Sequence, residues 1–214
     1  MKFKLVQGVG NYSEGTACIM SAAVAYKRIL AGVDIGEATD ELHCVCPVIR
    51  AFLIRINDSA VWSNDLHRTN VLLPLIPRIV GTRNPELWSK RMFFLVNWSV
   101  KTITPLILKE LGFKINAVKL ESLADIVDYE SANAANVAIA GTYGAVANAV
   151  YNAIGAAAAA CTDTWVANAI YNATRSATCS ATIIKGAYTV ASEDLKEKIV
   201  VELITILDQL LDVK

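Results

Sequence analysis

The sequence predicts an all-α protein, and three observations carry this prediction. Residues 129–190 are rich in alanine, the best helix former: twenty of the sixty residues from Ser131 to Val190 are alanine. Apolar residues recur at the helical period in several segments of the remaining chain. Serine, asparagine, proline and glycine stand where these segments begin and end, as helix capping requires. With 54% hydrophobic and 19% charged residues, the 214-residue chain falls outside the disordered class.

The charge of the chain is balanced overall but unevenly distributed. Residues 1–114 carry fourteen Lys/Arg and nine Asp/Glu, which gives 14 − 9 = +5, and residues 115–214 carry six and eleven, which gives 6 − 11 = −5. We expect two parts that pack on each other as one compact domain: an N-terminal helical unit over 1–114 and an alanine-rich helical half over 115–214. A charge of +5 is too small to favour nucleic-acid binding.

The first segments read as a short extended piece followed by two helices. Residues 2–7 fit a short strand or arm, which Gly8 and Gly10 end. A helix from an N-cap at Ser13 to Ala31 follows, because its apolar residues share one helical face. After a polar loop over 32–45, Pro47 suits the first turn of a second helix that ends at residues 57–59.

The later segments continue the helical pattern up to the C-terminus. A third helix is expected from Asn64 to Gly81, kinked or split at Pro74 and Pro77, because proline removes an intrahelical donor. A fourth is expected over 84–111 with a bend at Pro105, then a connector over 113–128 with a short helix over 121–127. The last helix begins at a Ser192 cap and has an apolar stripe formed by Leu195, Ile199, Leu203, Ile206 and Leu210.

The alanine-rich run contains a near-repeat. Residues 146–153 return as residues 166–173, twenty positions later. At about 100° per residue, twenty residues would turn the two copies of a continuous helix to nearly opposite sides. We therefore predict a break near Gly155 or residues 162–164, and an antiparallel helical layer that packs against the N-terminal unit.

The start of the chain and its cysteines indicate a reducing compartment. The first residues lack the apolar core of an export signal, and the alanine-rich run is too polar for a membrane span, so we expect a cytoplasmic protein without a membrane partner. The five cysteines are an odd number, and free thiols are the default.

A metal or thiol site is the first chemical hypothesis to weigh. His43, Cys44 and Cys46, with Cys18 elsewhere, offer four possible zinc ligands, but zinc sites draw on two separated ligand pairs and no second cluster exists. Cys46 stands at a helix start, which favours a thiolate, and His43 or His67 could serve as its base. We favour thiols packed in the core, and we expect no metal and no cofactor.

A polar set at helix ends is the second hypothesis. Glu14, Cys18, Asn57, Asp58 and Arg68 lie near apolar faces and could converge on a ligand. The structural interpretation is helix capping together with an Asp58–Arg68 ion pair, and we favour it. No phosphate-binding glycine loop and no hydrolase motif is found, so no catalytic residue is assigned.

The repeat offers an interaction surface. Tyr143, Tyr151 and Tyr171 each combine an apolar body with a polar tip, which suits a protein interface. Asn148 and Asn168 occupy equivalent places in the two copies and could line a groove, or could hydrogen-bond across a tight helix pair.

Several short motifs in the first part of the chain resemble a protein family. These are Glu14-Gly15-Thr16-Ala17-Cys18-Ile19-Met20, Cys46-Pro47-Val48-Ile49, Asn57-Asp58, Arg68, Leu73-Pro74 and Gly81-Thr82. The set resembles a family of small uncharacterised proteins of tailed bacteriophages and some bacteria, notably actinobacteria, whose second halves are often alanine-rich. The resemblance implies a phage or phage-like origin and no known activity.

Three functions remain open from the sequence. The leading hypothesis is a non-enzymatic phage-type accessory protein that binds a host protein, in host takeover or counter-defence, or that assembles into a homo-oligomer. The second is a protein that binds or sequesters a small nucleotide-type signal. The third is an enzyme of unknown reaction that uses the set around Glu14 and Arg68.

Overall fold

The computed structural model describes residues 3–58, 62–110, 112–139 and 193–213. This part of the chain is mostly helical, which confirms the all-α class. Its contacts divide it into two compact units, Met1–Pro85 and Glu86–Lys214, and each is described by itself. The boundary expected at residue 114 lies inside the second unit. The repeat and its expected break lie outside the described residues.

The first unit begins with two short parallel strands, β1 (Lys4–Leu5) and β2 (Thr16–Ala17). The Val6 N–H donates to the Ala17 carbonyl at 2.9 Å. Between the strands the chain makes the 3-10 turn η1 (Tyr12–Glu14), which Asn11 caps and Gly15 ends at a φ of 70°. The helix expected from Ser13 therefore begins only after Cys18, because residues 16–17 are paired with β1.

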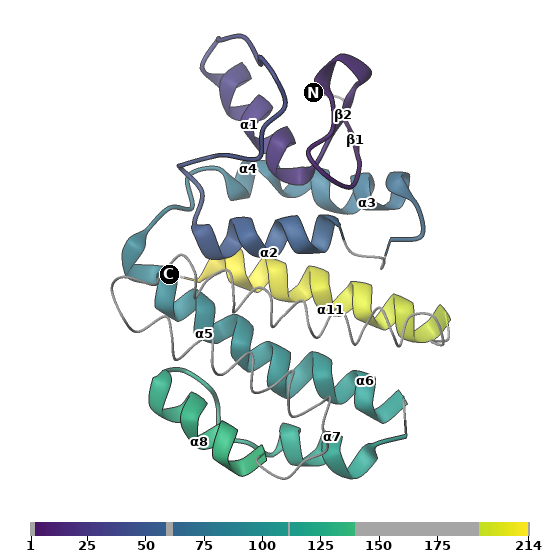
Figure 1. Cartoon of the computed structure of the whole chain (residues 1–214), viewed down its shortest axis with the longest axis vertical. Coiled ribbons are helices and arrows are strands. Elements are labelled where there is room, and N and C mark those ends of the chain that lie inside the picture. Colours follow the sequence, from purple (N-terminus) through teal and green to yellow (C-terminus); the bar gives the residue numbers. More distant parts are fainter. Residues whose placement is uncertain (1–2, 59–61, 111, 140–192, 214) are drawn as a thin grey trace. The chain divides into compact units, whose positions relative to one another are not determined.

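Two helices of this unit follow the sequence pattern closely (Figure 1). Helix α1 (Ile19–Leu30) has Cys18 as its N-cap and buries every side chain from Ile19 to Ala25. Helix α2 (Pro47–Asn57) has proline at its first position, as predicted, and packs against α1. Its buried residues are Val48, Ile49, Phe52, Leu53, Ile56 and Asn57.

The predicted third helix is split at its two prolines. Helix α3 (Asp65–Leu72) is capped by Asn64, whose side chain accepts from the His67 N–H at 2.8 Å. The 3-10 turn η2 (Leu73–Leu75) and helix α4 (Ile76–Ile79) follow, with Pro74 and Pro77 in their first turns. The expected start of the helix at Asn64 and its split at the prolines are both confirmed.

The second unit begins with a long helical rod that has a wide turn in its middle. After the 3-10 turn η3 (Pro85–Leu87), the chain forms α5 (Trp88–Trp98), the π-helical turn η4 (Ser99–Ile103) and α6 (Thr104–Glu110). Pro105 lies directly after the π-helical turn. The expected irregularity at this proline is thus a local widening of the helix, since the missing proline N–H removes one α-helical hydrogen bond.

Three further helices are described in the second unit. Helix α7 (Lys114–Glu121) packs on α6, and α8 (Tyr129–Ile139) opens the alanine-rich run. The short helix expected over 121–127 is wrong, because the helix here lies earlier in the chain and α7 ends at Glu121. Residues 123–127 carry no helix.

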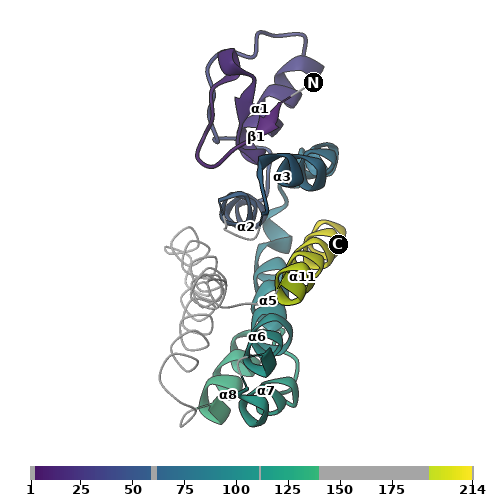
Figure 2. The same cartoon turned by 90° about the vertical axis from the view of Figure 1, so that its right-hand side faces the viewer.

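Helix α11 (Glu193–Asp212) contacts α5, and the two lie side by side in Figures 1 and 2. At the C-terminal end of α11, the buried Arg91 of α5 donates from Nη2 to the Val213 carbonyl at 3.3 Å. The predicted apolar stripe is buried along its whole length: Leu195, Ile199, Leu203, Ile206 and Leu210.

Candidate functional site

The predicted polar set centres on the C-terminal end of α2. Asn57 is fully buried. Its Nδ2 donates to the Val6 carbonyl at 2.7 Å and to Asp58 Oδ1 at 2.9 Å, and its Oδ1 accepts from the Ile19 N–H at 3.2 Å. One amide thus joins the end of β1 to the first turn of α1, which is a structural role.

Asp58 continues this network at the surface. Its Oδ1 accepts from the Gly8 N–H at 3.1 Å, and its backbone carbonyl accepts from Gln7 Nε2 at 3.2 Å. Asp58 therefore holds the turn after β1 against the end of α2.

Arg68 does not pair with Asp58, so the expected ion pair is wrong. Arg68 lies in α3 and is 4% exposed; its Nη1 pairs with Asp65 Oδ1 at 2.5 Å and donates to the Leu5 carbonyl at 3.3 Å. The Leu5 N–H donates to Thr69 Oγ1 at 2.8 Å. Residues of α3 thus satisfy both backbone groups of Leu5 that face away from β2, where a further strand would otherwise pair.

The carboxylate of Asp65 also carries a surface ion pair. Lys4 Nζ lies 2.9 Å from Asp65 Oδ2. The hydrogen bond from Lys4, and then the one from Arg68, holds the pKa of Asp65 below its usual value.

Glu14 and Cys18 complete the predicted set without meeting a common cavity. Glu14 is exposed in η1, and its Oε1 accepts from Asn11 Nδ2 at 3.1 Å. The buried Cys18 thiol accepts from the Ser21 N–H at 3.2 Å and so caps α1. Capping, backbone bonding and contacts with neighbouring side chains occupy all five residues, and the ligand-binding hypothesis for them stays a prediction without support from the geometry.

The interface candidates Tyr143, Tyr151, Tyr171, Asn148 and Asn168 lie outside the described residues. Cys18, Cys44 and Cys46 are free thiols, and Cys18 and Cys46 are buried. Among the residues that the structure describes, no group of three or more His, Cys, Asp or Glu side chains is arranged to hold a metal ion.

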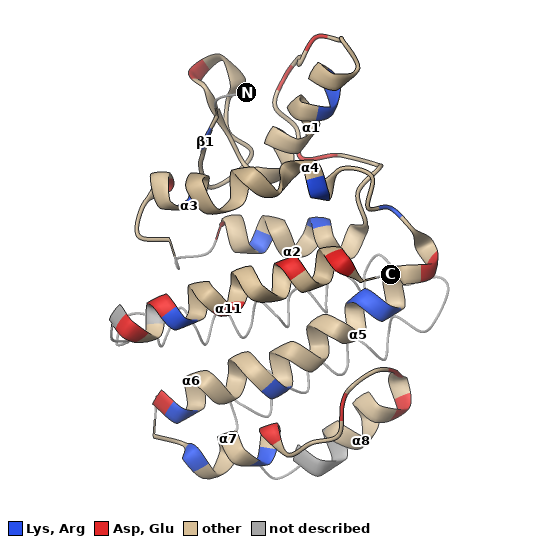
Figure 3. Ribbon diagram, turned by 180° about the vertical axis from the view of Figure 1, so that it is seen from behind, with Lys and Arg blue, Asp and Glu red and all other residues tan. Residues whose placement is uncertain are grey.

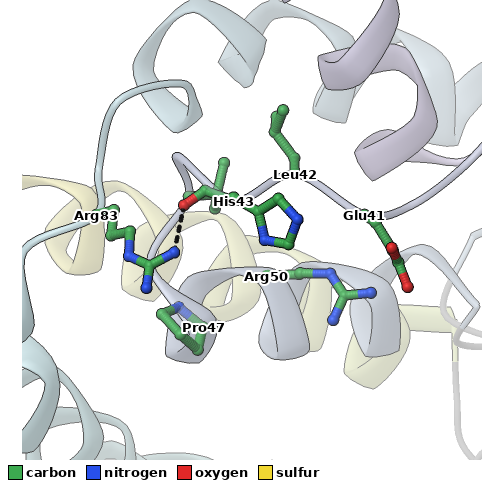
Figure 4. Close-up of a pocket in the computed structure, with 7 residues that line it drawn as sticks. Glu41, Leu42, His43, Pro47, Arg50 and Arg83 are labelled. Atoms are coloured by element: carbon green, nitrogen blue, oxygen red, sulfur yellow. Dashed lines mark hydrogen bonds between the residues drawn. The ribbon is translucent and has the colours of Figure 1, made fainter.

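The opposite end of α2 carries a pocket that the sequence did not single out. It has a volume of about 230 Å³. Figure 4 shows the His43 imidazole between the side chains of Arg83 and Arg50, above Pro47 at the start of α2. The remaining lining residues are Glu41, Leu42 and Val45.

Both arginines of the pocket are held in place by the chain that precedes α2. Arg50 donates from Nε to the Asp40 carbonyl at 2.9 Å, and its Nη2 lies 3.1 Å from Asp40 Oδ1. Arg83 donates from Nη1 to the His43 carbonyl at 2.8 Å, and its N–H bonds to the Cys44 carbonyl at 3.0 Å. The two guanidinium groups are thus fixed by loop backbone and remain partly open to solvent.

An apolar surface on α7 is the second feature that could act on another molecule. Phe113, Ile115 and Val118 are 57%, 75% and 58% exposed. The opposite side of the same short helix buries Ala117 and Leu120. We call Phe113, Ile115 and Val118 the outer face of α7. The basic residues of this helix are visible in Figure 3.

Sequence reasoning missed both features for identifiable reasons. Arg83 lies in the turn after α4, far along the chain from His43 and Arg50, so no spacing links them. A signal for the outer face was present in the sequence. Ile115 and Val118 have the i, i+3 spacing of one helical face, and Ala117 and Leu120 have the same spacing on the opposite face.

Comparison with protein-family models, with curated proteins and with solved structures finds no match to this chain. Within the described ranges, no helix combines the length and apolar character needed to cross a bilayer.

Proposed function

We propose that the protein acts by binding another protein, without chemistry of its own, and that the outer face of α7 is the contact surface. One observation carries this proposal: Ile115 and Val118 of α7, and Phe113 directly before this helix, expose large apolar side chains to water, although α7 already buries Ala117 and Leu120 and packs on α6. Contiguous exposed apolar surface on a protein is typical of an interaction site.

The energetics favour a partner over bare solvent at this surface. Burying an Ile, Val or Phe side chain contributes about 1.5–3 kcal/mol, so three such residues supply several kcal/mol to a complex. The folding of the chain does not use the free energy of burying these three side chains, because Ala117 and Leu120 are the residues of α7 that are buried.

The charges around the outer face specify the partner. Lys114 and Lys119 are exposed on α7, and neither forms an ion pair with a residue that the structure describes. The partner that fits is therefore a protein whose apolar groove has an acidic rim. The resemblance to phage proteins supports a host protein in this role, with host takeover or counter-defence as the outcome of binding.

Site-specific photo-crosslinking tests this proposal. A photoreactive residue at Ile115 should give one discrete heteromeric adduct in cells of the bacterial host, whereas the same residue at Val201, which is 54% exposed on α11, should not. The changes Lys114→Glu and Lys119→Glu should weaken the adduct at position 115, because they repel an acidic rim.

Three results would contradict the proposal. Equal adducts at positions 115 and 201 would indicate random collision without specific recognition. An adduct that forms equally well in both charge-reversal variants would exclude a partner with an acidic rim. An adduct with the mass of two copies of the chain would show that this surface binds a second copy of the chain and not a host protein.

A further inference from the structure

The pocket at the N-terminal end of α2 has features that the protein-binding function does not use. Its arginines come from two places in the chain, α2 for Arg50 and the turn after α4 for Arg83. Both belong to the first unit, whereas α7 belongs to the second.

Each guanidinium group in the pocket retains hydrogen-bond donors. A guanidinium has five N–H donors. Arg50 uses Nε and Nη2 on Asp40, and Arg83 uses Nη1 on the His43 carbonyl, so both keep N–H groups for a ligand. Holding the guanidinium groups on backbone carbonyls lowers the entropy that binding would cost.

The start of α2 adds a partial positive charge to the same place. Pro47 lines the pocket and occupies the first helical position. The Cys46 thiol makes no capping hydrogen bond at this end, and the Cys46 N–H donates to Thr82 Oγ1 at 3.1 Å. The N-terminal end of a helix attracts anions through its dipole and its free N–H groups.

The acidic residues at the pocket reduce the positive electrostatic potential that the arginines and the start of α2 produce. Asp40 neutralises Arg50 at 3.1 Å, and the carboxylate of Glu41 lines the pocket on the side of Arg50. Two arginines and two carboxylates give a formal charge of zero, so the binding of an anion depends on donor geometry at the Arg83 side. Glu41, on the Arg50 side, opposes the binding of an anion in the pocket by charge repulsion.

The volume and the walls of the pocket limit the ligand. A space of about 230 Å³ is smaller than the 300–1,000 Å³ of sites that enclose drug-sized molecules. It accommodates a phosphoryl group and a small attached body, and the apolar Leu42, Val45 and Pro47 would contact that body. Guanidinium forks match phosphate oxygens in geometry.

We propose that this pocket binds a small phosphate monoester, with the phosphoryl group on the free donors of Arg83 and beside the start of α2. The remainder of the ligand lies against Val45 and Pro47. Arg83 supplies most of the attraction because no carboxylate pairs with it among the described residues.

Calorimetric titration of the full chain with phenyl phosphate, inorganic phosphate and benzoate tests the proposal. Phenyl phosphate should bind more tightly than inorganic phosphate because its ring reaches the apolar wall, and benzoate should bind at least tenfold more weakly. Arg83→Gln should weaken phenyl phosphate binding about tenfold or more. Glu41→Gln should strengthen it several-fold, which loss of folding could not produce.

Lys27→Gln is the matched control, because it removes one exposed positive charge of the first unit outside the pocket. It should leave the affinity for phenyl phosphate unchanged. Absence of saturable binding, equal losses in Arg83→Gln and Lys27→Gln, equal binding of benzoate, or weaker binding in Glu41→Gln would each overturn the proposal.

Discussion

The two ends of α2 carry similar polar residues for different purposes. At the C-terminal end, the amide of Asn57 and the carboxylate of Asp58 bond to Val6, Gly8 and the start of α1. At the N-terminal end, Arg50 and Arg83 bond to loop carbonyls and still have donors facing a pocket. The difference shows that a polar residue indicates a binding site only if it keeps donors or acceptors that the surrounding backbone groups do not use.

The same contrast separates two arginines of the first unit. Arg68 is buried and completes the hydrogen bonds of the edge of β1, whereas Arg83 is exposed beside the start of α2. Substitutions at these positions should therefore act on different measured quantities: stability for Arg68 and binding for Arg83.

The largest loss of stability should come from Asn57→Ala. This change leaves the buried Ile19 N–H and the partly buried Val6 carbonyl without their partner, and an unsatisfied buried group costs about 1–3 kcal/mol. We expect the free energy of unfolding to fall by about 3 kcal/mol in urea titration.

Asp58→Ala is the matched control at the neighbouring position. Because Asp58 lies at the surface, water can replace its bond to Gly8, and the loss should be about 1 kcal/mol or less. If the two variants lose the same stability, Asn57 is not the centre of this end of α2.

Arg68→Ala should have the second largest effect, about 2 kcal/mol. The Leu5 carbonyl loses a buried donor. Asp65 stays hydrated and keeps Lys4, so the penalty of an isolated buried charge does not arise. Among the residues that the structure describes, Arg68 Nε has no hydrogen-bond partner, which limits what the native side chain contributes.

Arg68→Met separates the two causes, because it keeps the aliphatic stem and removes the donors. Unfolding titrations should place its stability between those of the wild type and Arg68→Ala. A Met variant as unstable as the Ala variant would assign the whole effect to hydrogen bonding, and one as stable as the wild type would assign it to packing.

Much of the helical framework could be predicted from the sequence, because its signals are local. Pro47 at a first position, the Asn64 cap and the interruptions at Pro74 and Pro77 act within one turn of the chain. The apolar stripe of α11 is likewise a property of its own residues. The start of α1 could not be predicted, since it depends on the pairing of residues 16–17 with β1.

The candidate sites were harder to predict because they depend on long-range contacts. Arg68 pairs with Asp65, three residues away, and not with Asp58, because α3 turns its side chain towards Leu5. The approach of Arg83 to His43 joins segments forty residues apart. The Asp65–Arg68 pair follows the i, i+3 spacing of a helix, whereas no periodicity encodes the contact of Arg83 with His43.

A pH series tests whether Asp65 contributes to the edge of β1. Its pKa is lowered in the folded chain, chiefly by Lys4, so its stabilising effect is complete above the unfolded-state value of about 3.9. The effect is lost as the pH falls through the lower pKa of the folded state. Between pH 5 and pH 3 the wild type should therefore lose more stability than Asp65→Asn, which lacks the titrating group.

The comparison between the two variants removes the contribution of every other carboxylate that titrates in this range. Since the Asp65 carboxylate is partly exposed, we expect a difference smaller than the effect of Arg68→Ala. Parallel losses in both proteins would show that the ion pairs of Asp65 contribute nothing to folding.

The smallest effect on stability should come from Arg83→Gln, and this outcome bears most directly on the contrast between the ends of α2. Arg83 is exposed, and its bond to the His43 carbonyl can be replaced by water, so the free energy of unfolding should change by about 0.5 kcal/mol or less. The backbone bond from the Arg83 N–H to Cys44 remains in the variant and keeps the turn in place. A loss comparable to that of Arg68→Ala in the same urea titration would mean that Arg83 is a structural residue. The two ends of α2 would then both serve the fold, and the donors of Arg83 could no longer be assigned to a ligand.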